Sequence, residues 1–196
     1  EDSSEELKMV DTADDEIAGL IYTAGTTGRP KGVMLSHYAL YYNAEMQVET
    51  VQLTRDDTAV SALPLCHSYG IASMNAAGLI GAKGIILDRF DIEEIFKAVD
   101  KYKARLFTGV PTMYVFMNLL HSELAGKYDL SSIKYWISGA APLSLETARE
   151  FKEKFGRDII EGWGLTEAGA NNSVNPIRGP YKVGSIGKPM KGTEMK

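Results

Sequence analysis

The segment TAGTTGRPKG, residues 23–32, has the composition of an anion-binding loop. Its three glycines allow backbone N–H groups to approach an anion, and its threonines, Arg29 and Lys31 add donors and positive charge. It is not a Walker A motif, because Gly25 and Gly28 are too close together and Pro30 precedes the lysine. The composition favours a polyphosphate-binding loop, and the alternative is a glycine-rich surface turn.

The segment EGWGLTEAG, residues 161–169, combines a flat ring with oxygen ligands. Trp163 stands between two glycines, where its ring is suited to stacking on a base such as adenine. Thr166 and Glu167 place a hydroxyl beside a carboxylate, a pair that can orient a phosphate and hold Mg²⁺. A core tryptophan beside a solvated glutamate is an equally good interpretation of these residues.

Two other segments carry weaker signals. LPLCHSYG, residues 63–70, contains His67 and Tyr69, but neither a G-x-S-x-G serine nor an organised acid accompanies the histidine, so a hydrolase triad is unsupported. SGAAP, residues 138–142, consists of small residues at the end of a predicted strand. Such residues permit the close approach of a flat ligand or of another backbone segment.

Composition limits the classes of function. The chain has 21 Lys and Arg against 26 Asp and Glu, which argues against sequence-independent nucleic-acid binding. A single cysteine, Cys66, cannot form an intrachain disulfide, and the three histidines are too dispersed for a zinc site. There is no apolar run of the ~20 residues needed for a membrane span, and the acidic first residues do not resemble a signal peptide. We therefore expect a cytoplasmic protein without a transmembrane segment.

Short apolar runs alternate with helical patterns along the chain. Strands are predicted at 19–23, 58–63, 84–87, 105–108, 134–138 and 158–161, and helices at about 36–51, 91–99, 111–120 and 145–155. Ser36 can cap the first helix, and Asp91 with Glu94 forms a capping box. The alternation predicts an α/β fold with a largely parallel sheet and helices on both faces. Ligands of such sheets bind beyond the carboxyl ends of the strands, which is where the segments described above lie.

Five segments resemble, in order and approximate spacing, the motifs of the adenylate-forming superfamily: YTAGTTGRPKGVMLSH, LPLCHSYG, DLSSIKYWISGAAPL, EGWGLTEAG and VGSIGKPMKG. That superfamily contains acyl-CoA synthetases, aryl-CoA ligases, beetle luciferases and the adenylation domains of peptide synthetases. The resemblance runs from about Asp14 to Lys196. It implies part of the large N-terminal domain of such an enzyme, with residues 1–15 as an acidic lead-in and 16–196 as an AMP-binding subdomain that is incomplete at both ends.

The resemblance also implies roles for individual residues. The phosphate-binding loop for ATP would comprise Thr23, Ala24, Gly25, Thr26, Thr27, Gly28 and Lys31. The other contacts with the nucleotide would come from Gly139, Ala140, Ala141, Glu161, Gly162, Trp163, Gly164 and Thr166, with the tryptophan where the family usually has tyrosine. Glu167 would bind Mg²⁺, and Lys31, Thr166 and Glu167 would be the catalytic residues. The acid substrate would contact His67, Tyr69 and Ser73, and Arg89 would meet the phosphate of CoA.

The implied reaction has two halves. The carboxylate of a small-molecule acid attacks the α-phosphate of Mg-ATP, and the CoA thiol then displaces AMP to form a thioester. GLTE and the histidine-bearing LPLCHSYG favour an acyl-CoA synthetase, with a fatty acid as the preferred substrate and an aryl acid as the second. Family members also have a ribose-binding aspartate and a catalytic lysine further along the chain. Because this sequence contains neither, the alternative is a nucleotide-binding fragment without catalytic activity.

Overall fold

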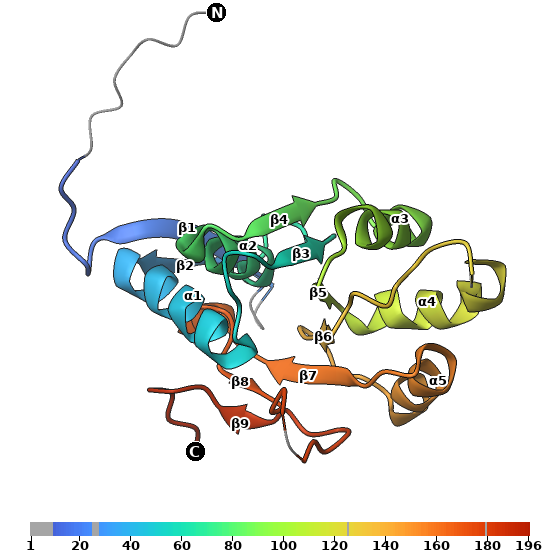
Figure 1. The fold of residues 1–196 in the computed structure, drawn as a ribbon. Coiled ribbons are helices and arrows are strands. Elements are labelled where there is room, and N and C mark those ends of the chain that lie inside the picture. Colours follow the sequence, from blue (N-terminus) through green and yellow to red (C-terminus); the bar gives the residue numbers. More distant parts are fainter. Residues whose placement is uncertain (1–9, 25–27, 125, 179) are drawn as a thin grey trace, which may run out of the picture.

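The computed structural model describes residues 10–24, 28–124, 126–178 and 180–196. Within them, a seven-stranded sheet has the order β4-β3-β5-β6-β7-β8-β9, and β1 and β2 form a separate two-stranded ribbon (Figure 1). The parallel strands are β3 (Thr58–Ser61), β4 (Lys83–Ile86), β5 (Leu106–Gly109), β6 (Tyr135–Ser138) and β7 (Ile159–Trp163). The antiparallel strands β8 (Ser173–Val174) and β9 (Lys188–Pro189) extend the sheet. The predicted α/β fold with a largely parallel sheet is confirmed.

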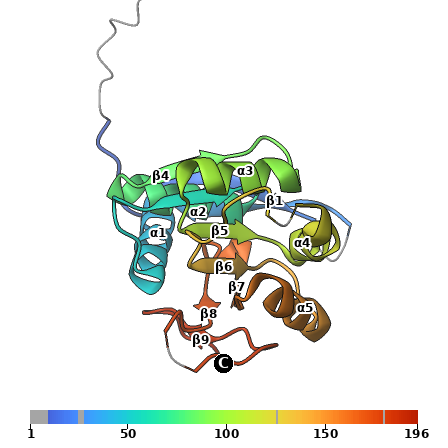
Figure 2. The ribbon, with the colours of Figure 1, turned by 45° about the vertical axis from the view of Figure 1, so that its right-hand side comes forward.

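Helices cover both faces of this sheet (Figure 2). Helices α1 (His37–Val51) and α2 (Ser68–Ile80) lie on one face. Helices α3 (Ile92–Tyr102), α4 (Pro111–Leu124) and α5 (Leu145–Phe155) lie on the other, and a short 3₁₀ helix, η1 (Thr166–Ala168), follows β7. Each parallel strand from β3 to β6 is thus followed by a helix, as expected for crossover units.

Capping side chains determine where several of these helices begin. The Ser36 hydroxyl accepts a hydrogen bond from the backbone N–H of Ala39 at 3.1 Å, and the Asp91 carboxylate accepts one from Glu94 at 3.1 Å. Both contacts satisfy N–H groups that have no acceptor within the first turn of a helix. The two predicted helix starts are therefore confirmed.

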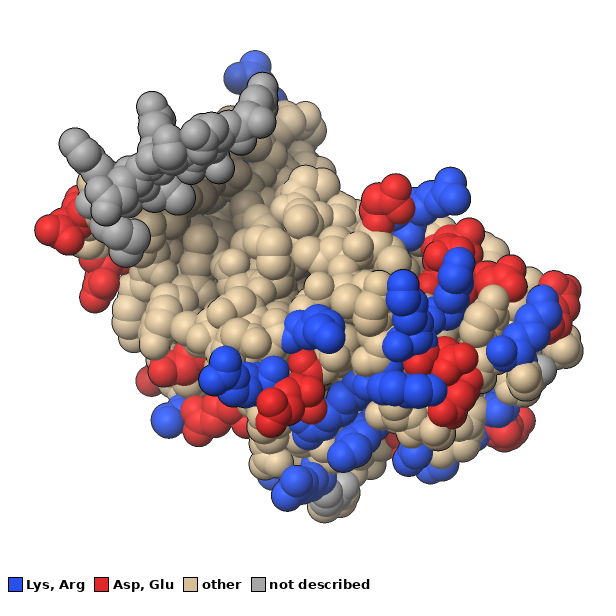
Figure 3. All heavy atoms as spheres, turned by 45° about the horizontal axis from the view of Figure 1, so that its top comes forward, with Lys and Arg blue, Asp and Glu red and all other residues tan. Residues whose placement is uncertain are grey.

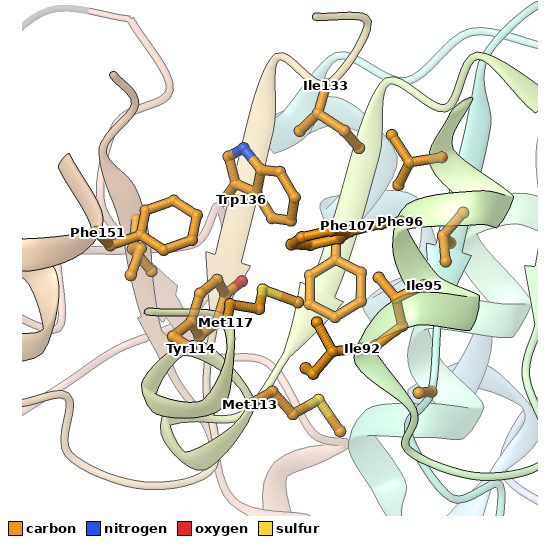
Figure 4. Packing of buried hydrophobic residues seen from close by; sticks show 14 of the residues in the cluster. Ile92, Ile95, Phe96, Phe107, Met113, Tyr114, Met117, Ile133, Trp136 and Phe151 are labelled. Carbon is orange, nitrogen blue, oxygen red and sulfur yellow. The ribbon is translucent and has the colours of Figure 1, made fainter. Parts of the chain in front are cut away.

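Strand alternation divides the apolar side chains between the two faces. Phe107 and Trp136 lie in the larger core, on the face of α3, α4 and α5, where they pack with Tyr114 and Phe151 (Figure 4). Ring centroids are 5.3 Å apart for Trp136 and Phe151, and 5.4 Å apart for Tyr114 and Phe151, both with the edge-to-face geometry that aromatic rings prefer. Leu106, one position from Phe107, packs on the opposite face with Val51 of α1.

The structure differs from the predicted elements in two places. The sequence predicts a loop as far as Gly32, but Lys31–Ser36 forms β2, which pairs antiparallel with β1 (Ile17–Thr23). The glycine- and threonine-rich loop therefore joins the two strands of a hairpin and does not follow a strand of the parallel sheet. Periodicity also failed to predict α2, because its sequence SYGIASMNAAGLI has no charged residue to mark a polar face.

Removing the Phe151 ring should strongly destabilise the protein. Phe151 is fully buried between Trp136, Tyr114 and Phe155, so we expect Phe151→Ala to lower the free energy of unfolding by about 3–5 kcal/mol. Phe116→Ala is the matched control, because that ring is 45% exposed, and it should cost about 1 kcal/mol or less. Urea denaturation of both variants measures the difference, and equal losses would contradict this account of the core.

Candidate functional site

A cavity of about 660 Å³ lies between the sheet and the helices α1 and α2. Its volume is within the range of small-molecule sites, and none of the described residues that line it is Lys, Arg, Asp or Glu. The lining includes Val110, Gly139 and Gly164, which directly follow β5, β6 and β7. One end of the cavity is therefore at the carboxyl edge of the parallel strands, where the sequence predicts the chemistry.

The cavity gathers predicted site residues that are far apart in the sequence. Those that line it are His67, Tyr69, Ser73, Gly139, Ala140, Gly162, Trp163, Gly164 and Thr166. The side chain of Trp163 is only partly buried, whereas Trp136 is 1% exposed within the core. Trp163 can therefore present its ring to a ligand, and the interpretation of it as a core residue does not apply.

Small residues in unusual conformations shape the wall at the strand ends. Ala140 and Ala170 both line the cavity and have positive φ angles of 69° and 106°, in a region that residues with a Cβ rarely adopt. A Cβ added to Gly164 would lie 1.4 Å from the carbonyl oxygen of Ala170, so only glycine fits there. The backbone after β6 and β7 is thus held in strained turns directly beside the cavity.

An asparagine network holds the loop that carries Trp163 and Thr166. The side chain of Asn172 accepts a hydrogen bond from the backbone N–H of Leu165 at 2.9 Å and donates one to the carbonyl of Ala168 at 3.1 Å. Asn43 of α1 donates to the carbonyl of Asn171 at 2.8 Å. These positioning residues were not identified from the sequence. The available signals were the pair of asparagines after GLTEAG and an asparagine within a helix, where its propensity is low.

The beginning of α2 is tied to η1. The hydroxyls of Ser68 and Thr166 are 3.1 Å apart, so the loops that follow β3 and β7 are joined by a hydrogen bond. Ser68, Tyr69 and Gly70 line the cavity, and the N-cap residue His67 makes no side-chain capping bond. Backbone N–H groups of a first helical turn lack intrahelical acceptors and carry partial positive charge, so this end of α2 favours an anion.

Two hydroxyl groups on α2 are buried without a partner. In the part of the chain that the structure describes, Tyr69 Oη and Ser73 Oγ make no hydrogen bond. Burial raises the pKa of the Tyr69 hydroxyl well above its ordinary value, so this group is a neutral donor. Both residues line the cavity, but their hydroxyl oxygens are shielded from solvent.

Among the described residues of the predicted phosphate loop, Thr23, Ala24, Gly28 and Lys31 do not line the cavity. Gly25, Thr26 and Thr27 are outside the described residues. Thr23 ends β1 and pairs with Lys31, the exposed first residue of β2. Ala24 directly precedes the undescribed residues, and Gly28 directly follows them. β2 contacts η1, the element that contains Thr166 and the exposed Glu167. The predicted catalytic residues are thus on two neighbouring elements.

Three other predicted residues do not line the cavity. Arg89 is exposed between β4 and α3, and Ala141 is exposed after β6. The Glu161 carboxylate is turned toward a later loop, where it accepts a hydrogen bond from the backbone N–H of Gly184 at 2.7 Å. Burial raises the pKa of Glu161, and burial together with the nearby Glu161 charge raises the pKa of Tyr181 to about 12. The side chain of Glu161 therefore positions the 184–187 segment.

The residues present fit a metal ion that arrives with a nucleotide. The described residues contain no cluster of three or more His, Cys, Asp or Glu side chains that could cage an ion. Glu167 is instead a single exposed carboxylate beside the Thr166 hydroxyl. Mg²⁺ is commonly bound by one or two carboxylates together with substrate phosphates, which is the arrangement that Glu167 permits.

None of the described helices is long and apolar enough to cross a membrane.

Comparison with known proteins identifies relatives along the whole chain. The family model for AMP-binding enzymes matches residues 1–196. A long-chain-fatty-acid–CoA ligase of Bacillus subtilis (strain 168) is 41% identical over 182 residues, which cover 91% of this chain and 32% of that protein. 4-Coumarate-CoA ligase 1 of Narcissus pseudonarcissus is 35% identical over 201 residues, which cover 97% of this chain and 36% of that protein.

A solved structure shows the same fold. The crystal structure of ATP-bound MatB from Rhodopseudomonas palustris matches with a TM-score of 0.85 and 33% sequence identity, and the match covers 95% of this chain and 36% of that one. The chain thus spans about a third of the length of the curated relatives it matches.

Neutralising Glu161 should change how stability depends on pH. Because its folded-state pKa is raised, folding favours the protonated carboxyl, and the native state loses stability as pH rises above the ordinary pKa of glutamate. We expect Glu161→Gln to raise the melting temperature near neutral pH and this advantage to shrink as pH falls toward about 4. Thermal denaturation across this pH range tests the trend. The exposed Glu153→Gln controls for the loss of one negative charge. A Glu161→Gln variant that is less stable than the original chain at neutral pH would show that the sign is wrong.

Proposed function

The chain belongs to the AMP-binding enzyme family, and on that premise we propose that it is the nucleotide-binding part of an acid–CoA ligase that forms an acyl-adenylate and then an acyl-CoA. The observation that carries this proposal is the convergence of Trp163, Thr166 and the first turn of α2 on one uncharged cavity at the carboxyl edge of the sheet. A stacking ring, a hydroxyl and a positive helix end are groups suited to adenine, a phosphate and a carboxylate, respectively.

We assign the nucleotide to the carboxyl edge of the sheet. Adenine would stack on Trp163 and lie against the small residues Gly139 and Gly162, while Thr166 would donate to a phosphate oxygen. Lys31 of β2 is next to this position because β2 contacts η1, and it would add positive charge. Bound through Glu167 and the phosphates, Mg²⁺ would supply charge stabilisation as pyrophosphate departs.

The acid would bind with its carboxylate toward His67 and the first turn of α2. One carboxylate oxygen then forms a bond to the α-phosphorus, and the bond to the bridging oxygen breaks, releasing pyrophosphate. In the second half, the thiol of CoA loses its proton to solvent, the sulfur forms a bond to the acyl carbon, and AMP leaves with the electrons of the broken acyl–oxygen bond. No general base is needed for the first half, because a carboxylate is already a nucleophile. The exposed Arg89 is our proposed contact for a CoA phosphate.

We propose a fatty acid as the substrate, because the described cavity lining is uncharged and largely made of apolar side chains. Burying an alkyl chain there is favourable, whereas a second carboxylate or an amino group would be desolvated without an ionic partner. An aryl acid is the second candidate. What supports it is the 35% identity with 4-coumarate-CoA ligase 1 of Narcissus pseudonarcissus.

Adenine stacking should be visible in tryptophan fluorescence. The chain has two tryptophans, and only Trp163 lines the cavity, because Trp136 is buried in the core on the other face of the sheet. We therefore expect Mg-ATP to change the emission of the original chain and to leave Trp163→Phe unchanged. Calorimetry on both proteins establishes whether ATP is bound. An emission change that persists in Trp163→Phe would contradict the stacking role.

Loss of either charged group near the phosphates should lower turnover by orders of magnitude. Removing one preorganised electrostatic contact typically costs about 10²–10³ in rate, so we expect this loss for Lys31→Ala and Glu167→Ala in a full-length protein that carries this segment. Lys134→Ala is the matched control, because Lys134 is an exposed lysine that directly precedes β6, at the amino end of the strand. A pyrophosphate-release assay with fatty acids measures the effect.

We expect the isolated 196-residue chain to be inactive in the same assay. Robust turnover by that chain, or unchanged turnover in Lys31→Ala and Glu167→Ala, would contradict the proposed roles.

A further inference from the structure

The floor of the cavity consists of two rows of residues on one face of the sheet. Strand pairing aligns Ile86, Ser61, Thr108 and Ile137 in the row nearer the carboxyl edge, and Gly84, Ala59 and Leu106 in the row nearer the amino edge. All seven residues line the cavity. Because alternate residues of a strand are about 6.6 Å apart along it, the second row extends the cavity by roughly that distance away from the proposed carboxylate site.

Small residues surround the second row at the end farthest from Thr166. Gly84 of the edge strand β4 and Ala59 of β3 form its floor, and Ala77 of α2 lies opposite Gly84. Gly78 and Ala82 line the same part of the cavity. From Ser68 to Gly78 the helix advances about 15 Å, so this group is well separated from the first turn of α2. We use the name far chamber for Ala59, Ala77, Gly78, Ala82 and Gly84.

Neither backbone conformation nor packing explains the glycine at position 84. Its φ angle is not among the positive ones, so the backbone there accepts any residue. A Cβ added to it would meet only the Cβ of Ala77 at 3.9 Å, an ordinary contact distance. Glycine in a strand weakens that strand, because it costs conformational entropy and gives no side chain to pack. Gly84 is exposed and lines the cavity, so a side chain there would enter the space between β4 and α2.

Gly78 shows the same pattern within α2. It has an ordinary helical φ angle, and a Cβ added to it would have no atom within 4 Å. A glycine inside a helix costs about 1 kcal/mol relative to alanine, so this position also lowers local stability without a packing reason. Figure 3 shows a broad face of the molecule without charged side chains, and charged side chains gather along its lower and right-hand sides.

We propose that the far chamber receives the end of the acyl chain and that Gly84 determines the longest chain the protein accepts. This inference rests on the proposed function, since it assumes that the acid binds with its carboxylate near His67 and its tail along the sheet. A residue larger than glycine at position 84 would place its side chain opposite Ala77 and close the chamber. The carboxylate end of the cavity would not change.

The test is the affinity of the 196-residue chain for hexanoic, octanoic, decanoic and dodecanoic acids, measured by calorimetry. In the original chain, affinity should rise about fourfold with each methylene until the chamber is full. In Gly84→Leu the rise should end at an acid roughly two to four carbons shorter, because the isobutyl group occupies that volume. Gly84→Ala should weaken binding of the longest accepted acid by about fourfold and leave hexanoic acid unaffected.

Gly19→Leu is the matched control. Gly19 is also a strand glycine with no atom within 4 Å of an added Cβ, but it is in β1 and does not line the cavity. Its profile should equal that of the original chain. An unchanged profile in both Gly84 variants, or equal weakening for all four acids, would overturn the role of Gly84 while leaving the proposed function intact. If the original chain binds none of the acids, the proposed acid site fails and this inference fails with it.

Discussion

The register of the parallel strands determines where every candidate group lies. Gly109 pairs with Ser138, and Ser138 pairs with Glu161, so β5, β6 and β7 end at the same edge of the sheet. The loops that follow β6 and β7 therefore begin side by side, although more than twenty residues separate them in sequence. A shift of one residue in any of these strands would exchange its two faces, sending core side chains into the cavity. The site thus depends on the correct pairing of short strands.

The two faces of the sheet differ in how closely they are packed. On the face of α3, α4 and α5, rings such as Phe107, Trp136 and Phe151 belong to the larger of the two buried apolar clusters. On the other face, the buried cluster comprises only Val51, Leu106, Ile137 and Ile160 among the described residues, and a cavity of about 660 Å³ separates α1 and α2 from part of the sheet. An empty cavity lowers the free energy of unfolding, and the close packing of the larger core offsets that loss. The face of α1 and α2 can therefore contain space for a ligand.

Hydrogen bonds to the backbone hold the loops around this space. Asn172 binds both Leu165 and Ala168, and Asn43 reaches the same loop from α1. Glu161, although predicted to flank a nucleotide, has its carboxylate on the Gly184 amide, and Ser173 donates to the carbonyl of Ile186. Residues near a nucleotide-binding motif can therefore act by positioning its neighbours. Preorganisation of this kind reduces the entropy that a ligand must otherwise overcome in ordering the loops.

The sequence by itself determined the class of fold and most of the strands and helices, because hydrophobic periodicity and capping residues such as Ser36 and Asp91 act over a few residues. Motif chemistry likewise identified Trp163, Thr166 and His67, which line one cavity. Only the tertiary structure revealed that Lys31 begins a hairpin strand, that Ser68 bonds to Thr166, and that Gly84 faces Ala77. These facts depend on contacts between residues far apart in the chain. A helix without a polar face, such as α2, and a cavity between elements leave no periodic pattern in the sequence, because packing alone creates them.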